Sequence, residues 1–236
     1  MNLIIKLTTA LLIAIPSQLF AISLDTAESP LSSIPQGIFG YQEKVGDTIH
    51  SFNWQAEEND SGISITVQED DKTFYNLCTA NGDTLMWRIL VEGKHNISAV
   101  RKGDTLHIEG TRFGNEYNKK VAIDKRPWYQ PLSFSLGSFL NSSEEKTSFW
   151  VIRADKIEVI ALTAEKLGVE DITFDGVSVP AQKVEIRADG FYSKFWHATY
   201  WYRKSDNLFL RYQSTHGLPG TDETIVELVE TPAQQS

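Results

Sequence analysis

Cysteine is nearly absent from this chain, and so are the motifs of known catalytic centres. The 236 residues contain a single cysteine, Cys78, which excludes an internal disulfide bond. Because Cys78 lies in an apolar strand pattern, a buried and inert thiol is favoured over a reactive one. None of the five histidines forms an HxH or HExxH pattern or a Cys/His pair, so we expect no metal site.

Enzymatic chemistry has little support in the remaining residues. The chain has no GxSxG motif and no glycine-rich phosphate loop. A glycosidase would need two carboxylates at a fixed separation. Glu165, Glu170 and Asp171 are close in sequence, but acidic side chains beside turns are usually solvated. We therefore expect a non-enzymatic protein with no catalytic residue and no cofactor.

Positive charge is scarce. The chain has 22 lysines and arginines against 31 aspartates and glutamates, which gives a formal net charge of −9. An acidic protein is repelled by nucleic-acid phosphates and by anionic membrane surfaces, and the charge favours solubility. We expect no nucleic-acid partner.

Long apolar runs are also missing, except for a short one at the N-terminus. Lys6 ends a short first segment, residues 7–15 are apolar, and residues 19–21 resemble a cleavage site. This order is typical of a secretory signal peptide, here residues 1–21. The run is shorter than the roughly 20 residues that span a bilayer, although an uncleaved membrane anchor is the alternative. We expect a periplasmic or secreted bacterial protein with no stable membrane span after cleavage.

The rest of the chain divides into three parts by composition. Residues 22–36 are small, polar and twice broken by proline, which predicts a flexible leader. Residues 37–230 show no composition shift and are expected to form a single antiparallel β domain. Residues 231–236 are expected to be a disordered tail.

Alternating polar and apolar residues, punctuated by turns, predict the fold class. Turn signals recur about every 10 residues, a spacing typical of an antiparallel meander. The strongest are Asn81-Gly82 and Asp175-Gly176, because these residues tolerate a positive φ. We expect a mostly β protein, with a large curved antiparallel sheet that forms a barrel or half-barrel and at most one or two short helices.

Two segments interrupt this pattern. Residues 124–140 contain two prolines and an aromatic cluster, which indicates a crossing segment between two halves of the sheet, with a short helix near residues 132–139. Lys156–Leu167 fits both helical and strand spacing; its β-branched residues favour a strand, and a helix is the alternative.

The densest group of large rings lies in residues 191–221. The pattern predicts two strands joined by a turn at residues 204–207, which form the central pair of the sheet. One face is expected to be core and carries Trp196, Ala198, Tyr200, Tyr202, Leu208, Leu210 and Tyr212. The other face carries Phe195, His197, Thr199, Trp201, Arg203, Phe209, Arg211 and Gln213.

The second face of this hairpin holds the candidate ligand-binding residues His197, Trp201, Arg203 and Arg211. One interpretation is a polar fringe that orients the head group of a ligand against ring surfaces. The other is a wet outer face, where rings and long side-chain stems simply cover the sheet.

The hairpin FWHATYWYRKSDNLFLRY, the following GLPGT, Gly176 and the strand VPAQKVEI also carry a resemblance. In strand order and turns, most of the mature chain resembles exported bacterial β-proteins of unknown function. Those are similar in plan to the periplasmic lipoprotein carriers, which have an unclosed β-barrel. The resemblance implies an apolar cavity in a concave sheet, covered by a helical lid.

Two functional hypotheses follow. The protein binds a lipid or another apolar or amphipathic ligand in the concave face of the sheet, without chemistry. Alternatively, it is an interaction or structural module of the cell envelope, which contacts another envelope protein through an outer aromatic patch.

Overall fold

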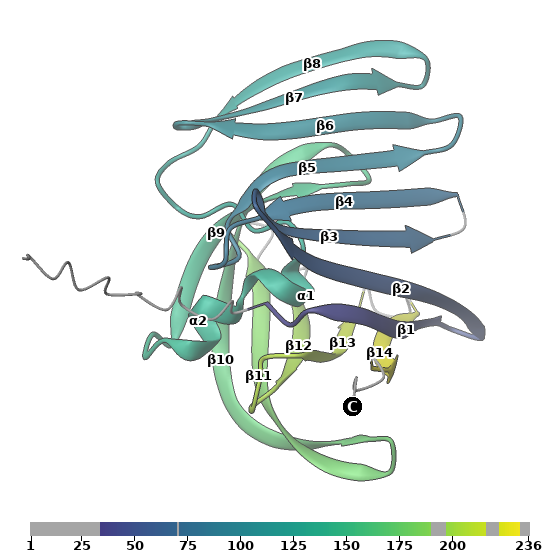
Figure 1. The fold of residues 1–236 in the computed structure, drawn as a ribbon, viewed down its shortest axis with the longest axis vertical. Helices are drawn as coiled ribbons and strands as arrows, with labels where there is room; N and C mark the ends of the chain where they lie inside the picture. The colour runs from purple at the N-terminus through teal and green to yellow at the C-terminus, as the bar shows by residue number, and fades with distance from the viewer. Residues whose placement is uncertain (1–33, 70, 190–196, 216–221, 232–236) are drawn as a thin grey trace, which may run out of the picture.

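A computed structural model describes residues 34–69, 71–189, 197–215 and 222–231. The expected signal peptide, most of the expected leader, Phe195, Trp196 and residues 232–236 lie outside the described residues. The described part of the chain forms one 14-stranded antiparallel sheet that curls around two short helices (Figure 1). The predicted fold class is confirmed.

The first half of the sheet is a meander of eight strands. Its strands are β1 (Gly37–Val45), β2 (Thr48–Asn59), β3 (Gly62–Glu69), β4 (Lys72–Cys78), β5 (Thr84–Val91), β6 (His95–Lys102), β7 (Thr105–Arg112) and β8 (Asn115–Ala122).

The crossing segment and the second half follow. They comprise α1 (Leu132–Ser135), α2 (Gly137–Asn141), β9 (Lys146–Arg153), β10 (Glu158–Phe174), β11 (Val177–Ala188), β12 (His197–Arg203), β13 (Phe209–Thr215) and β14 (Glu223–Glu230). The short helix predicted near residues 132–139 is confirmed as helical structure, divided into α1 and α2.

The first and last strands join the two meanders. Strand β1 pairs with β14, so the order runs from β8 through β1 and β14 to β9. Strands β8 and β9 are therefore the two ends of the sheet, and the barrel is not closed by backbone pairing. No helix among the described residues is both long enough and apolar enough to cross a membrane.

Local sequence explains the tight turns. Gly82 has φ +91°, and Asp175 and Gly176 have φ +50° and +73°. These left-handed conformations are the ones that Asn-Gly and Asp-Gly pairs adopt at low cost. Both hairpins predicted from these pairs are confirmed.

The ambiguous segment at residues 156–167 is a strand. Lys156 and Ile157 lie in a turn, and β10 then runs for 17 residues. A register shift between Lys166 and Gly168 bends β10 where it passes the end of β9. Beyond this point the β10–β11 hairpin extends as an arm, which curves along the bottom of Figure 1. Ile172 and Phe174 of the arm pack against the main core.

The concave face of the sheet, which holds α1 and α2, forms the main core. Phe134 of α1 packs against Phe39 and Trp54, with ring centroids 5.9 and 5.2 Å apart. The Tyr202 hydroxyl donates a hydrogen bond to the Leu132 carbonyl oxygen at 2.8 Å. Ile34, within the expected leader, is also buried in this core.

A second apolar cluster lies between the two ends of the sheet. Trp87 and Ile108 of the first half pack in one cluster with Trp128 of the crossing segment and Ile152 of β9. The Gln130 side chain accepts from the Ile152 amide and donates to its carbonyl oxygen, at 2.9 and 2.7 Å. The crossing segment thus fills the seam that backbone pairing leaves open.

The aromatic hairpin is formed by β12 and β13, as predicted, with the turn at residues 204–206. Two details of the prediction are wrong. The hairpin is not the central pair, because β12 and β13 lie between β11 and β14 while β1 and β2 occupy the centre. A register shift between Trp201 and Tyr202 places Phe209, rather than Leu210, opposite Tyr202, so Phe209 joins the core face.

Candidate functional site

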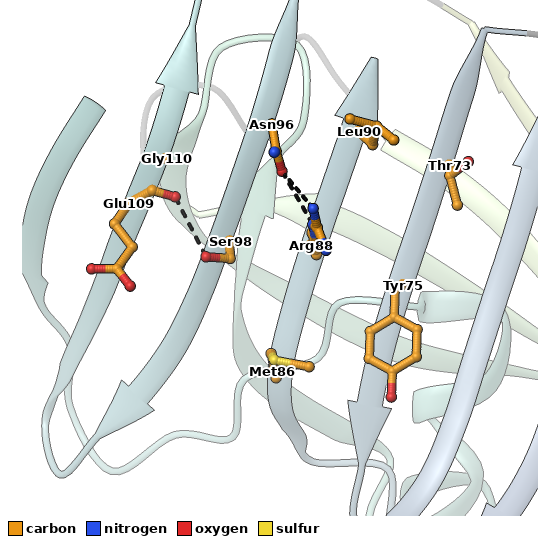
Figure 2. Close-up of a pocket in the computed structure, with 9 residues that line it drawn as sticks. All are labelled: Thr73, Tyr75, Met86, Arg88, Leu90, Asn96, Ser98, Glu109 and Gly110. Carbon is orange, nitrogen blue, oxygen red and sulfur yellow. Dashed lines mark hydrogen bonds between the residues drawn. The ribbon is translucent and has the colours of Figure 1, made fainter. Parts of the chain in front are cut away.

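A groove crosses the outer face of β4 to β7, on the side of the sheet away from α1 and α2. Its volume is about 830 Å³, within the usual range of roughly 300–1,000 Å³ for ligand sites. Figure 2 shows the lining side chains on four neighbouring strands. They are Thr73, Tyr75, Met86, Arg88, Leu90, Asn96, Ser98, Glu109 and Gly110.

Strand alternation and register bring these residues together. Tyr75, Arg88, Ser98 and Glu109 are successive cross-strand partners, which makes a row perpendicular to the strands. Because neighbouring strands lie about 4.8 Å apart, this row is about 14 Å long. The groove therefore suits an extended ligand better than a compact one.

Arg88 is the cation at the centre of the groove. Its Nε and Nη2 atoms donate to the Asn96 side-chain oxygen at 3.1 and 3.0 Å (Figure 2). This amide orients the guanidinium but does not neutralise it, and within the described ranges no carboxylate forms an ion pair with Arg88. Nη1 and the positive charge are available to an acidic group.

Apolar side chains flank this cation. Met86 and Leu90 lie two residues before and after Arg88 on β5, so all three point to the same face. Tyr75 is the cross-strand partner of Arg88. Leu90 is 43% exposed, which is a large solvent-facing apolar surface for a strand interior. The arrangement combines one positive charge with three apolar surfaces, and the Glu109 carboxylate lies two strands away from the cation.

Gly110 shapes the floor of the groove. Its φ is +142°, and a Cβ added there would lie 2.0 Å from the Asn96 carbonyl oxygen. A side chain at this position would therefore force β6 and β7 apart. The absence of a side chain at Gly110 leaves space beside Glu109 and Ser98.

Sequence reasoning missed this groove. The strand TLMWRILV reads as a generally apolar run, and only alternation separates inward Trp87 and Ile89 from outward Met86, Arg88 and Leu90. The outward-facing apolar pair Met86 and Leu90 was the sequence signal that could have indicated the groove. The partners on β4, β6 and β7 depend on register, which no single strand reveals.

Two of the four candidate ligand-binding residues lie together on the outer face of the second half of the sheet. Trp201 and Arg211 are cross-strand partners, and the Arg211 guanidinium lies 5.5 Å from the Trp201 ring centroid. Lys183 covers the same ring at 5.2 Å. As a result Trp201 is only 5% exposed, although its face of the strand was expected either to meet water or to line a ligand site.

The other two candidates are separated from this pair. Arg203 lies at the end of β12 and pairs with Asp206 of the turn at 2.5 Å. His197 is exposed at the opposite end of the same strand, next to residues that the structure does not describe. The structure thus brings together Trp201 and Arg211 but neither His197 nor Arg203 with them.

Ionic contacts dominate the surroundings of Trp201. Its indole N–H donates to Glu170 at 2.5 Å, and Lys183 pairs with the same carboxylate at 3.3 Å. The hydrogen bond from Trp201 is the main reason that the pKa of Glu170 lies below its usual range, with Lys183 adding to the effect. Arg211 pairs with Glu227 at 3.5 Å.

Groups suited to chemistry are few in the described residues. Within them, no group of three or more His, Cys, Asp or Glu side chains is placed to hold a metal ion. Cys78 is fully buried, and burial raises the pKa of its thiol to about 12. A thiol with such a pKa is protonated at neutral pH and is a poor nucleophile.

Comparison with solved structures supports the fold. The crystal structure of a β-barrel-like protein of a domain of unknown function (DUF1849) from Brucella abortus matches with a TM-score of 0.60. The match has 9% sequence identity and covers 84% of this chain and 98% of that chain. The two proteins share a fold. The expected resemblance to bacterial β-proteins of unknown function is confirmed at that level.

Two further solved structures match more weakly. The hypothetical lipoprotein YmcC from Escherichia coli has a TM-score of 0.37 and 10% identity, over 87% of this chain and 92% of that chain. The LolA superfamily protein NE2245 from Nitrosomonas europaea has a TM-score of 0.29 and 7% identity, over 87% and 91%. The assignment of the fold rests on the Brucella protein alone. No protein-family model and no curated protein matches this sequence.

Proposed function

We propose that this protein is an exported binding protein of the bacterial envelope that holds an extended, acidic amphipathic ligand, of the fatty-acyl class, in the outer groove of β4 to β7. The observation that carries the proposal is the placement of Arg88 between Met86, Leu90 and Tyr75. An acidic head group suits Arg88, and an apolar chain suits its neighbours. The protein performs no chemistry on the ligand in this account.

The concave face, where the ligand was expected, is less favourable. Its described side chains pack against one another and against α1, as the contacts of Phe134 with Phe39 and Trp54 show. A ligand there would have to displace these rings or the helix. The outer groove needs no such rearrangement, because it is already open.

Fluorescence titration of the delipidated protein with dansyl-labelled undecanoic acid tests this function. We expect saturable binding, weakened about tenfold or more by Arg88→Met, which removes the charge but keeps the stem. Leu90→Asn should weaken it by roughly tenfold through lost apolar contact. The methyl ester of the probe should bind the wild type as weakly as the acid binds the Arg88 variant.

The control is Lys120→Met, which removes an exposed cation from β8 outside the groove. It should leave the titration unchanged. Absence of saturable binding would refute a ligand-binding function for this probe class. Saturable binding that none of the groove variants alters would place the ligand elsewhere, with the concave face as the first alternative.

A second candidate function is an interaction module, and the β10–β11 arm favours it. Val169 and Val177 of the arm are 54% and 62% exposed. Exposed apolar side chains on an extended hairpin are typical of protein contact surfaces. In that case Trp201 stabilises the base of the arm through its hydrogen bond to Glu170.

Site-specific cross-linking separates the two functions. Cys78 is buried, so a cysteine introduced by Val177→Cys is the accessible thiol of the described residues. An interaction module predicts a discrete cross-linked envelope protein from position 177 but not from a control cysteine at Lys119 on β8. The binding-protein account predicts no discrete product from either position and intact binding of the acyl probe.

A further inference from the structure

A second depression lies where the crossing segment meets the end of the first half of the sheet. We name it the rim pocket; its volume is about 640 Å³. The residues that matter are Asp83, Leu85, Arg101, Lys125, Pro127 and Tyr129. None of them lines the outer groove, so the two sites are independent.

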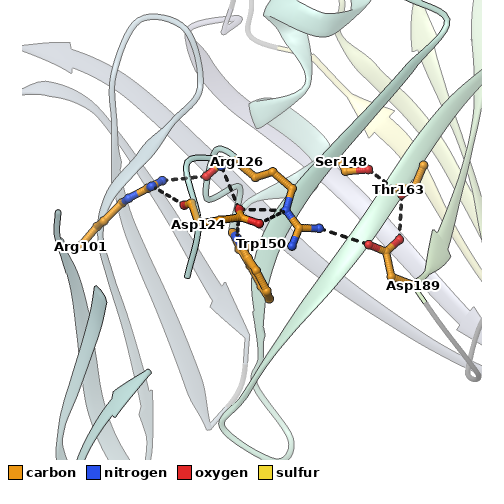
Figure 3. A network of polar contacts seen from close by, with 7 residues as sticks. All are labelled: Arg101, Asp124, Arg126, Ser148, Trp150, Thr163 and Asp189. Carbon is orange, nitrogen blue, oxygen red and sulfur yellow. Dashed lines mark hydrogen bonds and ion pairs between the residues drawn. The ribbon is translucent and has the colours of Figure 1, made fainter. Parts of the chain in front are cut away.

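Arg101 is held rigidly at one side of the rim pocket. Its guanidinium donates to three backbone carbonyl oxygens: Gly103 at 3.0 Å, Asp124 at 2.8 Å and Arg126 at 2.8 Å. Figure 3 shows Arg101 reaching the crossing segment at Asp124 and Arg126. Carbonyl oxygens fix the guanidinium but do not cancel its charge.

Asp83 lines the same pocket as this cation. Its carboxylate has no hydrogen bond or ion pair within the described ranges, and Arg101 is held by its carbonyl contacts instead of pairing with it. Burial raises the pKa of the Asp83 carboxyl, and the charge of Arg101 partly opposes that rise. Opposite charges therefore line the same pocket without an ion pair between them.

The remaining walls add a second cation and apolar surface. Lys125 is exposed, and in the described part of the chain its ammonium forms no ion pair. Leu85, which is 42% exposed, lies with Pro127 and the ring of Tyr129 along the same depression. The site thus offers an anion, a pair of cations and a short apolar wall.

From this arrangement we propose that the rim pocket binds a small zwitterion of the amino-acid or short-peptide class. The ligand's ammonium group lies against Asp83, and its carboxylate lies between Lys125 and Arg101. A small aliphatic side chain packs on Leu85 and Pro127. Such a ligand satisfies the opposed charges, which the protein by its own contacts leaves unpaired.

Isothermal titration of the full chain with L-alanyl-L-alanine tests the proposal without any mutation. The dipeptide should bind saturably. Its N-acetyl derivative, which lacks the ammonium charge, and its C-terminal amide, which lacks the carboxylate, should each bind roughly tenfold more weakly or worse. Equal binding of all three compounds, or no saturable binding of the dipeptide, would overturn the proposal.

Charge-removing variants assign each end of the dipeptide. Asp83→Asn should weaken the dipeptide about tenfold and abolish the discrimination against the N-acetyl derivative. Lys125→Met should reduce the discrimination against the amide. Lys102→Met changes a residue that is next to the pocket but does not line it. It should change neither the discrimination against the N-acetyl derivative nor the discrimination against the amide. Unchanged discrimination in Asp83→Asn would contradict the proposed orientation.

A failure of the rim-pocket proposal can be distinguished from a failure of the function proposed for the outer groove. Arg88→Met removes the positive charge of the outer groove and should leave dipeptide binding unchanged. Loss of dipeptide binding in Arg88→Met would show that the two depressions are not independent, and it would overturn the assignment of the zwitterion to the rim pocket.

Discussion

At the scale of single residues, the carboxylate of Glu170 joins three elements of the outer face. It accepts the indole N–H of Trp201 on β12 and pairs with Lys183 on β11. These contacts explain why a tryptophan on a face expected to meet water or a ligand is buried. Ion pairs and long stems above the ring exclude water from it.

The same carboxylate predicts a pH dependence of stability. The pKa of Glu170 is lowered in the folded protein, so it stabilises the fold above the usual glutamate pKa, and this stabilisation disappears as the pH falls through the lowered value. Glu170→Gln should therefore be less stable than the wild type at pH 7. The two should converge below the lowered pKa.

Urea unfolding at pH 7 and pH 3 measures this difference. Glu116→Gln, an exposed position on β8, is the matched control and should follow the wild type at both pH values. The free energy of unfolding of Glu170→Gln should differ from that of the wild type more at pH 7 than at pH 3. An equally large difference at both pH values would show that the carboxylate charge does not cause it.

Residue patterns alone could not predict the candidate sites. The outward position of Arg88 follows from alternation, but its contact with Asn96 depends on the register of β5 and β6. The same holds for Trp201, whose burial depends on Lys183 and Arg211 from neighbouring strands. Side chains that meet across strands are distant in sequence, which is why the groove was missed.

At the scale of elements, the β4–β5 loop connects the sheet to the helices. A Cβ added at Gly82 would lie 2.3 Å from the Ser135 carbonyl oxygen at the end of α1. The Ser138 hydroxyl also donates to the Asn81 carbonyl oxygen at 3.0 Å. This loop therefore fixes the position of the helices in the concave face.

Two glycine substitutions separate this packing from backbone strain. Gly176→Ala adds a Cβ with no atom within 4 Å, so its cost is that of a left-handed alanine, about 1 kcal/mol. Gly82→Ala carries a similar backbone cost plus the clash with α1, which should add roughly 1–3 kcal/mol. Thermal unfolding compares the two variants. Equal destabilisation would mean that α1 yields freely to the added methyl group.

Local sequence signals predicted the strands and hairpins well. They were less successful in predicting which face of the sheet each residue occupies. Asn-Gly and Asp-Gly turns identified the hairpins, and alternation identified the strands, because both depend on neighbours in sequence. The placement of Phe209 failed because the bulge between β12 and β13 changes which face the following residues occupy. A bulge is selected by packing across strands and has no clear sequence mark here.

At the scale of the whole molecule, the crossing segment closes the barrel-like sheet, through side chains and through backbone hydrogen bonds such as those between Trp150 of β9 and Pro127 and Tyr129. The network in Figure 3 links Arg101 of β6 through the crossing segment to Trp150 of β9. Arg126 extends it to Asp189 at 3.2 Å, and Thr163 donates to the same carboxylate at 2.8 Å. The two halves of the sheet are thus joined across the seam.

Removal of Arg101 tests how much this network contributes. Arg101→Met should lower the free energy of unfolding by roughly 1–3 kcal/mol, because three carbonyl acceptors lose a charged donor. Amide hydrogen exchange should rise in residues 124–130 and β8 but not in β12. Arg153→Met, which removes a surface pair with Asp155, should cost at most about 1 kcal/mol. Uniform exchange changes would contradict a local role at the seam.

Sequence reasoning reached the fold class but not the order of the sheet. The pairing of β1 with β14 joins the two ends of the described chain, and no local pattern predicts it. The groove and the rim pocket both depend on that larger arrangement.

The central claim is that the acidic amphipathic ligand lies in the outer groove. The chain has two methionines, Met1 and Met86, and Met86 lines the groove. NMR of protein labelled with ¹³C in the methionine methyl groups therefore reports directly on the site during titration with undecanoic acid. The account predicts a saturable shift of the Met86 methyl signal that is lost in Arg88→Met. Saturable binding with an unmoved Met86 signal would contradict it.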